Sequence, residues 1–233
     1  MIRYGCLVVC LLMSFIASAQ TELYTVSDPD GYVNIRSGPS SKTSIVDRVV
    51  PGEIIWVFPE EEAPGWFPVY FLADAFAVKP GMNVLGNQVE ASGYIHKSRL
   101  EPLSLQEVEF VTTSTDSSTT YSSDTVTLII TITANVDSPE GDAPFFLWGT
   151  DGGKPNKAYA SISLELGDRE IEFSQSMLDE LYQPNHWQAQ LLYDAVTSAY
   201  LLYMFNSDGA GSYEVVWQIL SDGEIRRYAF RPY

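Results

Sequence analysis

Cysteine, histidine and basic residues are scarce in this sequence, and each scarcity excludes a class of chemistry. The only two cysteines, Cys6 and Cys10, lie in an apolar stretch near the N-terminus that we expect to be cleaved off. The remaining chain would then have no disulfide, no thiolate nucleophile and no cysteine-ligated metal. The two histidines, His96 and His186, form no metal-binding spacing. We therefore expect no metal site and no cofactor.

Basic residues are outnumbered by acidic ones. The chain has 13 Lys and Arg against 30 Asp and Glu, a formal net charge of −17. Such a chain repels nucleic acid and anionic lipid surfaces, so neither is an expected partner. Two interpretations of the acidity stay open: it keeps the protein soluble, or it attracts a basic partner.

The longest apolar run has the organisation of an export signal. Arg3 supplies the positive start, residues 6–16 are an apolar core, and Ala17-Ser18-Ala19 is a small-residue cleavage site before Gln20. The run is too short to span a bilayer comfortably, which disfavours the alternative of a membrane anchor. We predict a signal peptide over residues 1–19 and an exported, periplasmic or extracellular protein with no membrane insertion after cleavage.

The rest of the chain has the pattern of an all-β protein. Turn residues recur about every ten positions, with β-branched and aromatic residues between them. The first expected strands cover residues 33–36, 45–50, 54–58, 66–71 and 93–96. Later ones cover residues 125–133, 145–148, 160–166, 170–173, 188–193, 200–205, 213–220 and 225–230, with tight turns at Asp168 and Asp222-Gly223.

Three segments of the second half are less regular. Residues 112–124 are mostly Ser and Thr, and we interpret them as an exposed hairpin or loop rather than a linker. Residues 188–205 match a hairpin, with a long helix as the alternative. One short helix is expected at 176–181, where Ser174 or Ser176 could cap an apolar stripe of Met177, Leu178 and Leu181.

Four short motifs in the first half occur in a characteristic order. The run DGYVNIRSGP at residues 30–39 comes first, and Pro51-Gly52-Glu53 then precedes an apolar strand. Gly65-Trp66 begins another strand, and Gly93-Tyr94-Ile95-His96 closes the series. In this order the motifs resemble the bacterial SH3 (SH3b) domain. Two departures are Tyr94, where the family usually has Trp, and a long apolar insertion at residues 72–90.

The resemblance implies an architecture of two parts. After the signal, we expect an SH3-like small barrel at residues 20–103, with the insertion at 72–90, and a C-terminal β-sandwich-like domain at 104–233. The segments LWGTDGG (147–153) and NSDGAGSYE (206–214) resemble parts of uncharacterised secreted β domains of gut-type bacteria. That second resemblance implies no activity, and both segments have the composition of glycine-rich turns.

The SH3b resemblance also implies a shallow groove with aromatic faces that recognises cell-wall peptide, peptidoglycan or an envelope protein. The candidate ligand-binding residues are Tyr32, Arg36, Trp66, Tyr94 and His96, with Trp56 as a further aromatic candidate. Each also has a structural interpretation. Trp66 would pack in the barrel, and Arg36 would pair with a carboxylate to fix its loop.

Motifs for catalysis are missing from the sequence. There is no Gly-x-Ser-x-Gly or Ser-x-x-Lys motif, and His186 lies in a turn that we expect at the surface. Asp28 and Asp30 begin like a calcium loop, but Pro39 occupies the position of its last glutamate. We therefore expect a non-catalytic binding protein. The alternatives are an acidic protein that binds or inhibits a basic partner, and a carboxylate-based glycosidase.

Overall fold

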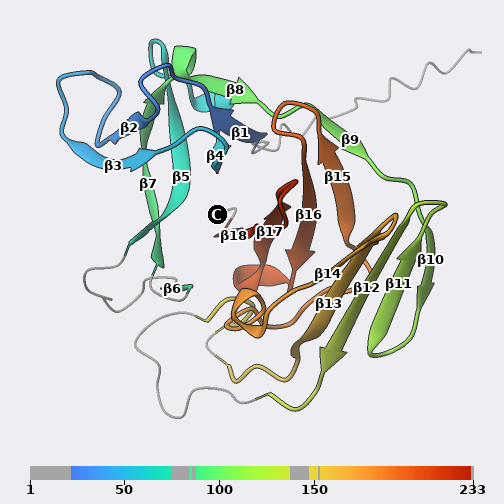
Figure 1. The fold of residues 1–233 in the computed structure, drawn as a ribbon. Coiled ribbons are helices and arrows are strands. Elements are labelled where there is room, and N and C mark those ends of the chain that lie inside the picture. Colours follow the sequence, from blue (N-terminus) through green and yellow to red (C-terminus); the bar gives the residue numbers. More distant parts are fainter. Residues whose placement is uncertain (1–21, 75–83, 86–87, 137–146, 152, 232–233) are drawn as a thin grey trace, which may run out of the picture.

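The computed structural model describes residues 22–74, 84–85, 88–136, 147–151 and 153–231. The predicted signal peptide at 1–19 lies outside these residues. As the sequence predicts, the fold is all-β, with three antiparallel sheets (Figure 1). The helical pieces in the described part of the chain are 3-10 turns of three residues each.

The first sheet takes all its strands from the N-terminal part of the chain. These are β1 (Glu22–Val26), β2 (Val33–Arg36), β3 (Ile45–Val49), β4 (Ile54–Val57), β5 (Trp66–Asp74), β6 (Val84–Leu85), β7 (Gln88–His96) and β8 (Leu100–Pro102). Their order is β3-β2-β7-β5-β4-β1-β8, with β6 paired to β7. The sheet bends around a core of its own, which includes Ile35, Val57, Val69 and Ile95. We call this part the N-terminal module.

The other two sheets pack face to face. One contains, in sequence order, β10 (Val111–Ser114), β11 (Ser118–Ser122), β12 (Val126–Thr133), β13 (Ala158–Leu166) and β14 (Arg169–Glu172). The other has the order β18-β17-β16-β15-β9 and comprises β9 (Leu105–Glu107), β15 (Gln190–Asp194), β16 (Ala199–Asn206), β17 (Tyr213–Ile219) and β18 (Ile225–Phe230). We call these two sheets the C-terminal sandwich.

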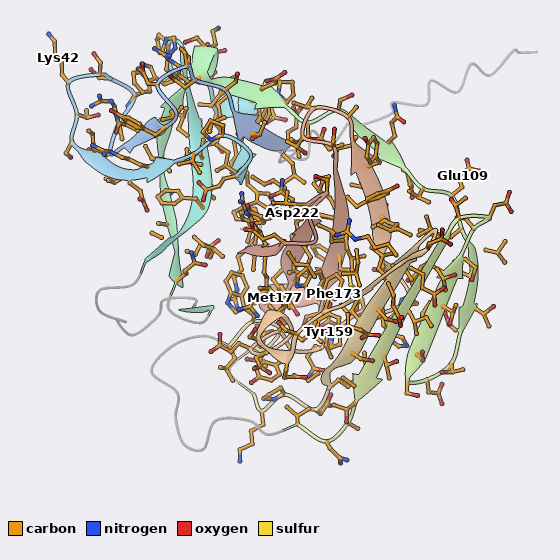
Figure 2. All side chains as sticks on the ribbon, viewed as in Figure 1. Lys42, Glu109, Tyr159, Phe173, Met177 and Asp222 are labelled. Atoms are coloured by element: carbon orange, nitrogen blue, oxygen red, sulfur yellow. The ribbon has the colours of Figure 1, made fainter. Side chains whose placement is uncertain are left out.

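The core of the sandwich draws on both sheets. Leu128 and Ile130 come from β12, Leu164 from β13, and Trp217 from β17. Tyr159 and Phe173 both meet the Trp217 ring edge-on, at centroid distances of 5.5 and 5.9 Å, and Figure 2 shows these two side chains close together at the same end of the sandwich. Strand β12 alternates buried apolar residues with outward residues that are threonines except for Ile129, as half-buried strands do.

The two ambiguous segments form hairpins. The Ser/Thr-rich residues 112–124 contain parts of β10 and β11, which pair antiparallel from Val111–Ser122 to Ser114–Thr119. Residues 188–205 contain β15 and β16, which pair from Gln190–Tyr203 to Asp194–Ala199. Ser198 in the turn has φ 54°, a left-handed conformation that a long helix would not allow.

The prediction of a short helix at residues 176–181 is wrong. Only a 3-10 turn forms there, over Gln175–Met177, and Ser174 makes no side-chain capping bond. Glu180 and Gln183 have positive φ angles of 69° and 52°, which stop a helix from continuing. Leu178 and Leu181 are buried nevertheless, so the apolar stripe in the sequence reflects packing of an irregular segment.

Strand β4 is buried on both faces and joins the two parts of the molecule. Ile55 and Val57 face the core of the N-terminal module. Ile54 and Trp56 face the other way and pack with Leu201, Val216 and Phe230 of the sandwich. A strand buried on both faces has a continuous apolar sequence, which explains the run Ile54-Ile55-Trp56-Val57.

The predicted insertion at 72–90 begins and ends as an extension of two strands. Leu72 to Asp74 of β5 pair with Glu90 to Gln88 of β7, and β6 adds an antiparallel pairing to β7. The residues between, at 75–83 and 86–87, lie outside the described part and include Phe76, Val78 and Met82. Trp66 is at the opposite end of β5 from this extension.

Candidate functional site

A cleft of about 650 Å³ opens on the N-terminal module, between the loops around β2 and the neighbouring ends of β5 and β7. We call it the N-terminal cleft. Its principal side chains are Asp28, Tyr32, Arg36, Trp66, His96 and Arg99. Four of the five candidate residues from the sequence, Tyr32, Arg36, Trp66 and His96, therefore line one cavity.

Strand register brings these residues together. Trp66 lies opposite His96 in the β5–β7 pair, and Arg36 lies opposite Tyr94 in the β2–β7 pair. Residues two apart on a strand share a face, so Tyr94 and His96 project from the same side of β7. Ile95, between them, is fully buried on the core side. Tyr94 thus shares the face of the cleft but is not among the residues that line it.

The aromatic rings at the cleft are held by their neighbours. Trp66 and His96 pack edge to face, with centroids 5.3 Å apart and an interplanar angle of 85°. The Tyr32 ring carries the Arg48 guanidinium at 4.8 Å from its centroid and is still 40% exposed. Such rings give a ligand flat apolar surfaces with little loss of side-chain freedom.

His96 is fixed in one orientation. Its Nδ1 accepts the backbone N–H of Ser98 at 3.3 Å and lies 2.8 Å from Ser98 Oγ. Because Nδ1 is an acceptor, the neutral ring carries its proton on Nε2. A Cβ built on Gly65 would stand 3.0 Å from Nε2, and Gly65 has φ +80°, so a glycine at this corner suits both the backbone and the ring.

Arg36 fixes the neighbouring loop, although its partner is not the expected carboxylate. Its Nη1 donates to the backbone oxygen of Thr43 at 2.8 Å. Thr43 Oγ1 in turn donates toward the carbonyl oxygens of Gly38 and Ser40. Arg36 therefore lines the cleft and also braces residues 38–43 of its wall.

The cleft contains charges of both signs. Asp28 is buried, forms an ion pair with Arg99, and accepts the backbone N–H of Asp30 at 2.8 Å. Asp30, Arg36 and Arg99 also line the cavity. Arg99 and Asp28 were not among the predicted ligand-binding residues. Only their positions in the sequence could have pointed to them, because Asp28 precedes the motif at residues 30–39 and Arg99 follows the motif at residues 93–96.

Trp56, the further aromatic candidate, is not at the cleft. It is buried between the module and the sandwich, where its Nε1 donates to Glu214 Oε2 at 3.0 Å. Burial raises the pKa of Glu214, and hydrogen bonds from Trp56 and Tyr203 partly offset this by favouring the carboxylate. Glu214 lies in a largely apolar strand, and nothing in the sequence pointed to its role.

His186 is not at the surface as expected. Its side chain is 2% exposed, and its Nε2 lies 3.2 Å from the backbone oxygen of Thr115 in the β10–β11 turn. Its own carbonyl accepts the Tyr121 hydroxyl at 2.7 Å. The turn that contains His186 is covered by a hairpin far away in sequence, which sequence-local reasoning could not predict.

Two searches of the described residues gave negative results. Within these residues no group of three or more His, Cys, Asp or Glu lies close enough to hold a metal ion. Glu140 and Asp142, which could contribute oxygen ligands, lie outside them. No helix in the described ranges is both long and apolar enough to cross a membrane.

Comparison of the chain with protein-family models, curated proteins and solved structures found no match.

Proposed function

We propose that this is an exported, non-catalytic binding protein whose N-terminal cleft recognises peptide, either the peptide of peptidoglycan or a segment of an envelope protein. One observation carries the proposal. Tyr32 and Arg36 from one motif, Trp66 from a second and His96 from a third line a single cavity of about 650 Å³.

The chemistry of the cleft suits a short peptide. Trp66 and Tyr32 offer faces for aliphatic groups and for the flat peptide bond. Arg36 and Arg99 can meet a carboxylate and the exposed Asp30 can meet an amine, whereas the Asp28 carboxylate is already paired with Arg99. A cell-wall peptide carries both kinds of group, so the mixture of charges matches it better than it matches a purely anionic or cationic ligand.

The cleft is also built before a ligand arrives. The Arg36–Thr43 bond holds the 38–43 loop, and the Ser98–His96 contacts hold the imidazole. Groups that are already ordered lose less conformational entropy on binding, so a shallow cleft can still bind usefully.

The test is retention of the purified protein on insoluble peptidoglycan. The wild type should be retained, and Trp66→Ala should weaken retention about tenfold or more, equivalent to ~1.4 kcal/mol. Tyr94→Ala should have a smaller effect, because Tyr94 shares the face but does not line the cavity. Val111→Ala is the control, since Val111 is 76% exposed on β10 in the other part of the molecule.

Circular dichroism should establish that each variant is folded. On glycan strands stripped of peptide, any retention should be the same for Trp66→Ala as for the wild type, because the N-terminal cleft is proposed to recognise the peptide. Failure of folded wild-type protein to bind intact peptidoglycan would exclude the cell-wall version of the proposal. Binding to envelope peptides that survives Trp66→Ala unchanged would exclude the cleft itself.

A further inference from the structure

A second cleft, of about 520 Å³, lies at one end of the C-terminal sandwich. We call it the C-terminal cleft. Its principal side chains are Asp151, Lys154, Lys157, Asn185, Trp187 and Asp208. Two glycine-rich segments of the sequence meet at this cleft, one ending near Gly153 and the other beginning near Asn206. The turn before β15 lies between them.

The walls of this cleft are tied to each other by hydrogen bonds. The Ser207 backbone N–H donates to Gln183 O at 3.0 Å, and Ser207 Oγ donates to Gly149 O at 3.0 Å. Asn185 Nδ2 donates to the carbonyl oxygens of Phe205 and Ser207 at 3.1 and 3.2 Å. Three turns that are far apart in sequence thus form one framework.

Two residues of this framework have strained backbones. Gln183 has φ 52° and Ser207 has φ 60°, both left-handed, although neither is glycine. Each such residue costs of order 1 kcal/mol or more and persists only where surrounding contacts hold it. Strained, well-bonded turns gathered at the end of a sandwich are where binding sites tend to be found.

Trp187 is the exposed aromatic platform of the cleft. It is 49% exposed, whereas the tryptophans at 56, 148 and 217 are buried. Its indole packs edge to face against His186, with centroids 5.0 Å apart at 74°. His186 is itself buried, so the support under the indole is fixed. A fixed and exposed ring offers a ligand a flat apolar face with little loss of side-chain freedom on binding.

The groups around the indole are polar and of both signs. Asp151 and Asp208 can accept hydrogen bonds, Lys154 and Lys157 can donate them, and the opposite charges balance. The apolar lining consists of Trp187 and the buried Pro184, so the cleft offers no deep apolar pocket to anchor a peptide side chain.

We propose that the C-terminal cleft binds a neutral saccharide chain. A sugar ring has an apolar C–H face that stacks on an indole, and a rim of hydroxyls that both donate and accept hydrogen bonds. That combination matches one exposed tryptophan surrounded by carboxylates, ammonium groups and an amide. The inference is independent of the peptide proposal, because it concerns other residues on the other part of the molecule.

The test uses soluble tetrasaccharides of β-1,4-linked N-acetylglucosamine, β-1,4-linked glucose and α-linked mannose. Each is titrated into the ¹⁵N-labelled protein while the indole N–H resonances of the five tryptophans are followed. At least one tetrasaccharide should shift the Trp187 resonance in a saturable manner and leave the buried Trp148 and Trp217 resonances in place.

Trp187→Ala should weaken the binding at least tenfold, and Trp187→Phe should restore part of it, because phenylalanine keeps an aromatic face. Val111→Ala serves as the control for loss of an exposed apolar side chain and should bind as the wild type does. A saturable shift of Trp66 with none at Trp187 would overturn this site. Absence of binding by all three tetrasaccharides would overturn the proposal, and that result would leave binding of peptide to the N-terminal cleft unaffected.

Discussion

At the scale of single residues, close packing explains why one of the short motifs begins with a glycine. Gly93, which opens the last family-like motif, lies where β7 crosses beside β2. A Cβ at this position would stand 2.5 Å from Ile35 Cγ2 and 2.9 Å from the Arg36 carbonyl oxygen. The glycine is therefore required by close approach of the two strands next to the N-terminal cleft.

We predict that Gly93→Ala destabilises the protein by about 1–3 kcal/mol, because the added methyl group must displace Ile35 or the backbone. The matched control is Gly153→Ala. Gly153 has nothing within 4 Å of a built Cβ, so this change should stay within about 0.5 kcal/mol. Urea unfolding followed by tryptophan fluorescence measures both. Equal midpoints for the two variants would contradict the close contact.

The candidate residues show how far a sequence can specify a site. The motifs predict Tyr32, Arg36, Trp66 and His96 as ligand-binding residues, and all four line one cavity. The second function of Arg36, bracing Thr43, depends on the path of a loop. Tyr94 and Trp56 are aromatic residues suited to ligand binding, but neither lines the cleft. Tyr94 lies beside it, and Trp56 is buried against the sandwich.

Among the elements, alternation was a dependable guide where one face of a strand meets solvent. The burial of strand β12 alternates residue by residue, and threonines occupy every outward position except Ile129. Strands β4 and β17 do not alternate, because each is covered on both sides. The prediction of a short helix is wrong for a related reason, because burial here does not follow a regular period. The apolar spacing reflects contacts of Leu178 and Leu181 with the sandwich core and not a regular helical face.

The turn between β15 and β16 has a buried carboxylate at its base. Asp194 is fully buried and accepts hydrogen bonds from Thr197 N at 2.9 Å, Thr197 Oγ1 at 2.6 Å and Val196 N at 3.3 Å. It also accepts the backbone N–H of Ser104 at 2.8 Å, where the chain passes from the first sheet to β9. One side chain therefore organises both a hairpin and the crossing between sheets.

We predict that Asp194→Ala lowers the free energy of unfolding by about 2–4 kcal/mol, because it leaves several buried donors without an acceptor. Asp194→Asn keeps the shape and one good acceptor, so its cost should be smaller. Thermal unfolding measures the loss, and hydrogen exchange should show faster exchange of the Ser104 and Thr197 amides. A stable Asp194→Ala variant with unchanged exchange would refute this role.

At the scale of the whole molecule, the sheet of β9 and β15 to β18 is the central layer (Figure 1). One face packs against the β10–β14 sheet and the other against the N-terminal module. The second contact is specific as well as apolar. Gln218, fully buried, donates to Gly52 O at 2.9 Å, and Trp56 donates to Glu214. The two parts thus share a core.

The partly buried Glu214 makes this contact sensitive to pH. Because burial raises its pKa in the folded protein, the folded state holds this proton more tightly than the unfolded state does. The stability that this difference in pKa contributes is fully present below the unfolded-state pKa of 4.5. It is lost as the pH rises through the higher pKa of Glu214 in the folded protein. Other carboxylates titrate too, so only a comparison with a variant isolates this group.

We predict that Glu214→Gln gains stability relative to the wild type as pH rises from 4.5 to 8. Glutamine still accepts the Trp56 N–H and does not ionise. Calorimetric melting temperatures of the two proteins across this range measure the difference. A difference that stays constant with pH, or that favours the wild type increasingly at high pH, would contradict the effect of burial.

The sequence by itself determined the all-β class, most of the strands, and four of the residues that line the N-terminal cleft. It could do so because alternation, turn residues and short motifs are local, and their physical causes act within a few positions. The tertiary structure alone decided that Trp56 and Glu214 lie between two parts of the molecule, that His186 is covered, and that two glycine-rich turns meet beside Trp187. These three features depend on which surfaces cover one another. Such contacts join segments that are far apart in the sequence, so no single segment specifies them.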